Sequence, residues 1–199
     1  TIYRSVSGTP EQYLIKIVEL MGGIEKIIGS DDVVLIKPNV QWWNQGAPNL
    51  AALRALINLI VNRPGGFQGE IVLAENCHCG PAPWTSQSSG WAHYFERNSD
   101  LDNINHYNDF CVSMKKRYGE RFSAVHWVDV KSGGKRVYSP KDGMGYVYCD
   151  GTNGVPLLEC SNDARGNERR STIMTYPIFK TDKGTMIDFK NGIWTKGSY

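Results

Sequence analysis

The stretch Val33-Val34-Leu35-Ile36-Lys37-Pro38-Asn39 decides the fold of this 199-residue chain. Its four apolar residues without polar alternation, ended by a proline, predict a central strand covered on both faces. The segment Ile71-Val72-Leu73-Ala74 has the same character and predicts a second strand. Between them, Asn49 has the position of a helix cap, and the apolar run from Leu50 to Val61 predicts a helix.

Strand, helix and strand in this order form a βαβ unit, whose two strands are parallel and whose crossover is right-handed. We therefore predict an α/β fold with a parallel-sheet βαβ core. An earlier helix is predicted to begin at Thr9-Pro10-Glu11 and to end at Gly22-Gly23. A later helix is predicted over 110–118, and a third strand of the core sheet over 125–130.

The second half of the chain has a different pattern, which predicts antiparallel hairpins added to the core. The predicted hairpins pair residues 136–138 with 146–148, and residues 172–179 with 185–189. Residues 76–109 are rich in Gly, Pro, Ser, Asn and Trp and are expected to form a long loop insertion. We expect one α/β domain over 1–199, with its hairpin region at 131–199. Because no closing helix follows the last strand, we expect a fragment that is incomplete at its C-terminus.

Composition excludes some classes of protein. The formal net charge of +2 and the short basic clusters argue against nucleic acid as a partner. No apolar stretch reaches the ~20 residues that a membrane-spanning helix needs. The chain has no GxGxxG, GxxxxGK[ST] or GxSxG motif, which argues against standard dinucleotide-binding, P-loop and α/β-hydrolase enzymes. Its richness in Trp, Tyr, Asn and Gly slightly favours a periplasmic or extracellular location over the cytoplasm, and location stays open.

Polar residues follow both predicted core strands at their carboxyl ends, where open parallel sheets bind ligands. Lys37 can pair with an anion, Asn39 can donate and accept hydrogen bonds, and Glu75 can act as a base. We take these three as candidate catalytic residues. In the alternative interpretation, Pro38 only ends the strand and Asn39 only caps a turn.

Residues Cys77, His78 and Cys79 follow Glu75, and carboxylates, thiols and imidazoles all ligate transition metals. The three are candidate metal ligands, although their spacing is not that of a zinc finger. In an extended loop, Cys77 and Cys79 would lie on one side and His78 on the other, so a shared site needs a sharp turn. A reactive thiol and a purely structural use stay open. Asn76, Trp42 and Trp43 are candidate ligand-binding residues, with loop packing as the alternative for the tryptophans.

The Lys37-Pro38-Asn39 strand end, the helix from Asn49 and the second strand Gly69–Glu75 resemble the opening of the domain-of-unknown-function 362 family. The resemblance covers residues 10–80, with a weaker similarity over 176–194. It implies an α/β fold and a site at these strand ends. Members carry a later Lys-Thr-His element, but Asp182 replaces that histidine here, and the true counterpart is expected beyond Tyr199.

Two functions from different classes fit these observations. In the first, the chain is an enzyme or enzyme subunit that acts on a small anionic or polar substrate, with a transition metal as candidate cofactor. In the second, it is a non-catalytic exported module whose Trp-rich loops bind a ligand or a partner chain. A third possibility is that the chain is a structural half, which a partner chain or the missing C-terminal part completes.

Overall fold

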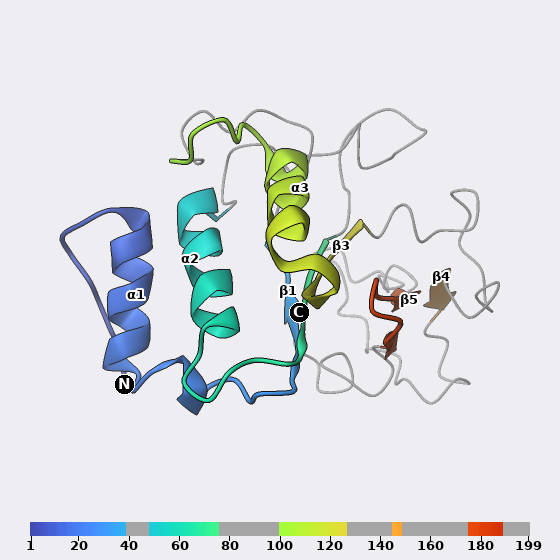
Figure 1. Ribbon diagram of the computed structural model, residues 1–199, viewed down its shortest axis with the longest axis horizontal. Coiled ribbons are helices and arrows are strands. Elements are labelled where there is room, and N and C mark those ends of the chain that lie inside the picture. The colour runs from blue at the N-terminus through green and yellow to red at the C-terminus, as the bar shows by residue number, and fades with distance from the viewer. Residues whose placement is uncertain (39–47, 76–99, 127–144, 149–174, 189–199) are drawn as a thin grey trace, which may run out of the picture. The chain divides into compact units, whose positions relative to one another are not determined.

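The computed structural model describes residues 1–38, 48–75, 100–126, 145–148 and 175–188 (Figure 1). The chain divides into two compact units, residues 1–128 and 129–199. The first unit contains the predicted βαβ core. The predicted antiparallel region over 131–199 falls within the second unit.

A three-stranded parallel sheet forms the centre of the first unit. Its strands are β1 (Val33–Ile36), β2 (Glu70–Glu75) and β3 (Phe122–His126), and β2 lies in the middle. Val33 pairs with Glu70 at the start of β1, and Ile36 pairs with Leu73 at its end. The predicted parallel arrangement of the first two strands is therefore confirmed.

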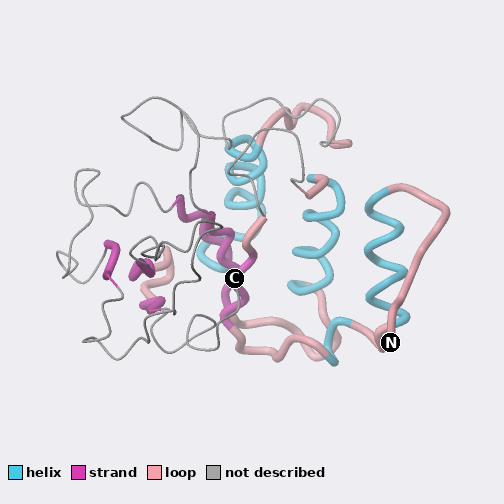
Figure 2. The backbone as a smooth tube through the Cα atoms, turned by 180° about the vertical axis from the view of Figure 1, so that it is seen from behind, coloured by secondary structure: helices cyan, strands magenta, loops and turns pink. Residues whose placement is uncertain are grey.

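Three helices stand side by side in chain order next to this sheet (Figures 1 and 2). They are α1 (Pro10–Leu20), α2 (Leu50–Val61) and α3 (Tyr107–Tyr118), with short 3₁₀ turns η1 (Ile24–Lys26) and η3 (Gly119–Arg121). Thr9 and Gln12 form a capping box at the start of α1. The Asn49 side chain accepts hydrogen bonds from the amides of Ala51 and Ala52, so both predicted caps are confirmed.

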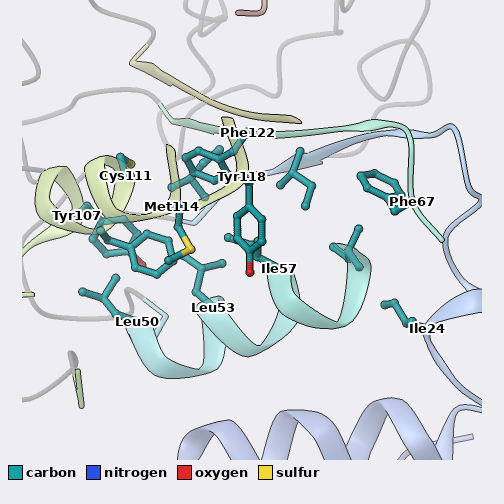
Figure 3. Packing of buried hydrophobic residues seen from close by; sticks show 14 of the residues in the cluster. Ile24, Leu50, Leu53, Ile57, Phe67, Tyr107, Cys111, Met114, Tyr118 and Phe122 are labelled. Carbon is teal, nitrogen blue, oxygen red and sulfur yellow. The ribbon is translucent and has the colours of Figure 1, made fainter. Parts of the chain in front are cut away.

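The hydrophobic core lies between the helices and one face of the sheet (Figure 3). Leu50, Leu53 and Ile57 of α2 point toward the aromatic residues of α3 and toward Phe122 of β3. Leu50 and Ile57 are fully buried. Because α2 and α3 share this core with β2, both crossovers cover the same face of the sheet.

The two predicted core strands differ in burial. All four residues from Ile71 to Ala74 are 0% exposed, which confirms that β2 is covered on both faces. By contrast, β1 lies at an edge of the described sheet, where Val33 is 42% exposed and the rest of the strand is half-buried. The prediction of a fully covered central strand is wrong for β1, because an apolar run without alternation does not distinguish an edge from a centre.

Two predicted boundaries need correction. The helix expected over 110–118 begins at Tyr107, because the His106 side chain caps it by accepting a hydrogen bond from the Asp109 amide. Histidine is an uncommon cap and gave no start signal. The strand expected over 125–130 is β3, which begins at Phe122 and includes His126 as its last residue. The predicted strand therefore starts three residues too late, and its predicted end lies outside the described residues.

The second unit contains an antiparallel sheet of β4 (Gly145–Tyr148), β5 (Thr175–Lys180) and β6 (Met186–Asp188), in that order. The pairing of β5 with β6 confirms the predicted second hairpin. Strand β4 confirms the strand expected over 146–148 and pairs with β5. Its expected partner over 136–138 lies outside the described residues.

None of the described helices is long and apolar enough to cross a membrane.

Candidate functional site

Lys37 and Glu75 lie at the carboxyl ends of two adjacent parallel strands. Lys37 directly follows Ile36, whose partner Leu73 lies two residues before Glu75. Lys37 is exposed, and Glu75 pairs in register with His126, the last residue of β3. The backbone therefore brings the starts of the two following segments to the same edge of the sheet.

The described residues that follow these two segments are also neighbours. The first returns at Pro48 and Asn49, where α2 begins, and the second returns at Asp100 and leads to Tyr107 of α3. The Tyr107 hydroxyl donates to the Pro48 carbonyl oxygen at 2.9 Å. The Asn49 amide nitrogen donates to the Asp100 carboxylate at 2.8 Å. The described residues before and after these two segments are thus neighbours, at the strand ends through the pairing of β1 with β2 and at the helix starts through these two hydrogen bonds.

The backbone near the second return point has an uncommon conformation. Asp100 and Asn103 have positive φ angles of 46° and 60°, the left-handed region in which Asp and Asn are better tolerated than other non-glycine residues. The hydrogen bond between Asp100 and Asn49 fixes one of these residues. Such conformations are enriched at functional sites, which makes this region a candidate part of the site.

His106 and Asp109 form a small polar cluster at the start of α3. The His106 Nδ1 atom accepts from the Asp109 amide at 3.1 Å, which leaves the ring proton of the neutral form on Nε2. Nε2 lies 3.5 Å from the Asp109 carboxylate. The same carboxylate accepts from the Asn105 amide. The half-buried His106 ring therefore caps the N-terminus of α3.

Several of the predicted site residues lie outside the described part of the chain. These are the catalytic candidate Asn39, the ligand-binding candidates Trp42, Trp43 and Asn76, and the metal-ligand candidates Cys77, His78 and Cys79. Lys37 and the backbone of Glu75 are the two that the structure describes. Their predicted roles stay predictions.

Metal binding at this edge also stays a prediction. Within the described ranges, no three histidine, cysteine, aspartate or glutamate residues are grouped closely enough to hold a metal ion. The candidate ligands Cys77, His78 and Cys79 are not among the residues covered by that observation.

The described sheet differs in one respect from doubly wound sheets that bind ligands at their carboxyl edge. In those sheets a crevice opens where the strand order reverses. Strands β1, β2 and β3 follow one another in chain order, so no reversal occurs among them. The candidate site therefore rests on the adjacent strand ends and on the contacts between the residues that flank the two following segments, rather than on a crevice between diverging crossovers.

Sequence reasoning missed Asp100, His106 and Tyr107 as neighbours of the site. Turn-forming residues such as Asp102 and Asn103 mark a loop, but they do not indicate which distant residue the loop contacts. The contact between Asp100 and Asn49 depends on the tertiary fold, so no local signal could have revealed it.

No protein-family model matches this chain, and no curated protein or solved structure matches it significantly. The resemblance to the domain-of-unknown-function 362 family therefore rests on the quoted residues alone and remains a hypothesis.

Proposed function

We propose that the chain is an enzyme, or a subunit of one, that acts on a small anionic or polar substrate bound at the carboxyl edge of β1 and β2. The observation that supports this proposal best is that the residues on either side of the two segments after these strands are neighbours. They start from paired strands and return through the Tyr107–Pro48 and Asn49–Asp100 hydrogen bonds. Two polar segments whose flanking residues are neighbours on both sides can contribute side chains to one ligand.

In this proposal the three catalytic candidates have different roles. The Lys37 ammonium neutralises the charge of the substrate, and the Asn39 side chain orients it by donating and accepting hydrogen bonds. Glu75 is the general base, or a metal ligand beside Cys77 and His78. Asn76, Trp42 and Trp43 line the site.

A metal-assisted version of the reaction would use Cys77, His78 and Cys79, with Glu75 as a further ligand. Thiolate, imidazole and carboxylate are the donor types that zinc prefers, so the chemistry of this set fits a transition metal. Elemental analysis of the purified chain tests this version separately. Less than about a tenth of an equivalent of metal after mild purification would contradict it, since structural and catalytic zinc sites hold their metal tightly.

The proposal is tested with Lys37→Ala and Glu75→Ala, each checked for folding by circular dichroism. The probes are inorganic phosphate, succinate and citrate, and the measurement is the ligand-induced shift in melting temperature. A probe at about ten times its Kd stabilises the folded chain by roughly 1.4 kcal/mol, or about 3–6 °C. Both variants should lose most of that shift.

Lys26→Ala and Glu120→Ala are the matched controls, because each removes one exposed charge of the same sign elsewhere in the first unit. The controls should keep the full shift. If the Lys37 and Glu75 variants keep it as well, the proposed site is in the wrong place.

The second candidate function is a non-catalytic binding module. The observation that favours it is that the segments after β1 and β2 together carry Trp42, Trp43, Trp84 and Trp91, whose rings could stack on a planar or sugar ligand. A change in tryptophan fluorescence with a sugar probe, together with no response to the anionic probes, would favour this function over the first.

A further inference from the structure

Strand β1 leaves one side of the parallel sheet open to a further strand. It lies at an edge of the described sheet, where β2 is its only described neighbour. The Glu70 amide donates to the Asp32 carbonyl oxygen, so Asp32 directs its backbone groups toward β2. Because successive residues of a strand direct their N–H and C=O groups to alternate sides, those of Val33 and Leu35 point away from β2. The outer edge of β1 therefore presents the amides and carbonyls of these two residues.

This outer edge lacks three devices that usually prevent pairing with another chain. Protected edge strands carry a charge, a proline or a bulge. The four residues of β1 are all apolar, and their register with β2 runs without a bulge. Val33 is 42% exposed, and the rest of the strand is half-buried. Pairing with another strand would remove apolar surface of β1 from water.

Both faces of β1 are incompletely covered. Val34 and Ile36 pack against the hydrophobic core and are only partly buried, as is Ile28 in the chain before the strand. Val33 and Leu35 lie on the opposite face, because side chains alternate along a strand. By contrast, residues 71–74 of β2 are 0% exposed. The core is therefore closed at β2 and partly open at β1.

The two ends of β1 carry opposite charges. Asp31 and Asp32 directly precede the strand, Lys37 directly follows it, and all three residues are exposed. When two copies of β1 pair in the antiparallel direction, the acidic end of each lies beside the basic end of the other. In a parallel pairing, like charges would meet and repel. The edge is thus complementary in charge to a second copy of itself, in the antiparallel direction.

Two-fold symmetry restricts the register of such a pair. A continuous sheet through a two-fold axis keeps each face on its own side, so one residue must lie on the axis opposite itself. With Val34 on the axis, Val33 of each copy lies opposite Leu35 of the other, and their outward backbone groups meet. Strand spacing then brings Asp31 of each copy opposite Lys37 of the other, on the same face. With Leu35 on the axis, Lys37 would instead lie opposite the apolar Val33.

We propose that two copies of this chain form a symmetric dimer through their β1 edges, with Val34 at the axis and one continuous sheet through both copies. Val33 and Leu35 exchange backbone hydrogen bonds across the interface, and Asp31 pairs with Lys37 of the other copy at each end. The partly exposed apolar surface of β1 becomes buried. The dimer does not depend on the proposed ligand site, although Lys37 belongs to both.

The first test is the mass of the purified chain in solution, measured by sedimentation equilibrium. Because β1 has four residues, the contact belongs to the small end of specific interfaces, and we expect a Kd on the order of micromolar. The mass should approach twice the 22.3 kDa of one chain as the concentration rises. The mass of a single chain at about 500 µM would overturn the proposal, and would show that something other than a second copy covers the edge.

Val33→Pro tests the backbone pairing. Proline is accepted at the first residue of a strand and where the N–H points away from the sheet, so the fold should persist by circular dichroism. The variant removes an outward donor and should raise the dimer Kd about tenfold or more. Val33→Thr is the matched control, because it keeps the amide and the branched shape, and its Kd should stay close to that of the unmodified chain. Equal Kd values for the two variants would contradict pairing through β1.

Reversal of the charges tests the antiparallel direction. Asp31→Lys and Lys37→Glu should each raise the dimer Kd, by about threefold to tenfold, because each places like charges opposite each other. The double variant should regain most of the lost affinity, since opposite charges meet again. A double variant weaker than both single variants would overturn the proposed arrangement.

A disulfide tests the register. Val34→Cys places two thiols opposite each other in a non-hydrogen-bonded pair, whose Cα atoms lie about 4.5 Å apart, within the range of a disulfide. Mild oxidation should link the two copies, and a reductant should separate them. Val33→Cys is the control and should give no more linked dimer than the unmodified chain, whose own five cysteines set the background. Linking by Val33→Cys and not by Val34→Cys would contradict the register. If a variant does not fold, the mass of the unmodified chain still decides whether the dimer exists.

Discussion

Gly69 lies so close to Asp32 that a Cβ atom on Gly69 would be 2.0 Å from the Asp32 carbonyl oxygen. Around this contact, the amides of Gln68 and Gly69 both donate to the Ser30 carbonyl oxygen, and the Glu70 amide donates to that of Asp32 at 3.0 Å. These bonds join the chain entering β1 to the chain entering β2. They set the register that places Lys37 and Glu75 at the same edge of the sheet.

Gly69→Ala should therefore destabilise the fold by about 1–3 kcal/mol or more, because the added methyl group meets backbone that cannot move without shifting the register. Denaturant unfolding measures this loss. Gly29→Ala is the matched control, since its added Cβ would meet the Asp32 carboxylate at 3.1 Å, a side-chain end that can shift at the cost of its hydrogen bond from the Gly29 amide. Equal losses in the two variants would contradict the role of the backbone contact.

Burial of Ile57 gives a second prediction. This residue is 0% exposed and lies in the core between α2 and the aromatic residues of α3. Ile57→Ala should cost about 2–5 kcal/mol of unfolding free energy, and Ile57→Val about 0.5–1.5 kcal/mol. Val112→Ala, at a position of α3 that is 70% exposed, should change stability by less than about 0.5 kcal/mol. A loss below about 1 kcal/mol in Ile57→Ala would contradict the described packing.

Asn49 has two roles that substitutions can separate. Its Oδ1 atom caps α2, and its amide nitrogen binds Asp100. Asn49→Ala removes both and should cost about 0.5–2 kcal/mol. Asn49→Ser keeps a capping oxygen but loses the bond to Asp100, so its loss in thermal unfolding should be smaller. If Asn49→Ser is as unstable as Asn49→Ala, the cap contributes nothing.

Cys111 makes stability depend on pH. Burial raises the pKa of this thiol well above its ordinary value. In the unfolded chain the thiol ionises near pH 8.5, whereas in the folded chain it stays protonated. Its stabilising contribution is therefore complete below about pH 8.5 and decreases as the pH rises further, by up to about 1.4 kcal/mol per unit.

Unfolding of the natural chain and of Cys111→Ala at several pH values between about 7.5 and 10 measures this effect. The difference in unfolding free energy between them should shrink as the pH rises. A difference that stays constant would show that the thiol ionises equally in the folded and unfolded chains. In the native state, Cys111 should also react slowly with thiol reagents, because the thiolate is the reactive form.

The parts of the fold that the sequence predicted are those with local signals. The apolar runs of β1 and β2 identified the strands, and Thr9 and Asn49 identified the helix starts. The parallel pairing followed from the helix between the strands.

The parts that could not be predicted depend on distant contacts. An edge and a central strand with the same apolar run look alike, so the exposure of Val33 was missed. The bond between Asn49 and Asp100 joins residues 51 positions apart, and neither sequence neighbourhood indicates it. For the candidate site, the apolar pattern alone placed Lys37 and Glu75 at strand ends. The contacts of Asn49 with Asp100 and of Tyr107 with Pro48 became visible only in the structure.

The most direct test of the central claim, that the segments after β1 and β2 form one ligand site, is an amide NMR titration with inorganic phosphate. The Lys37 and Glu75 amides should shift together and give one common Kd, and the Asp100 amide should follow them. Shifts at only one of the two strand ends, or two clearly different Kd values, would contradict a shared site.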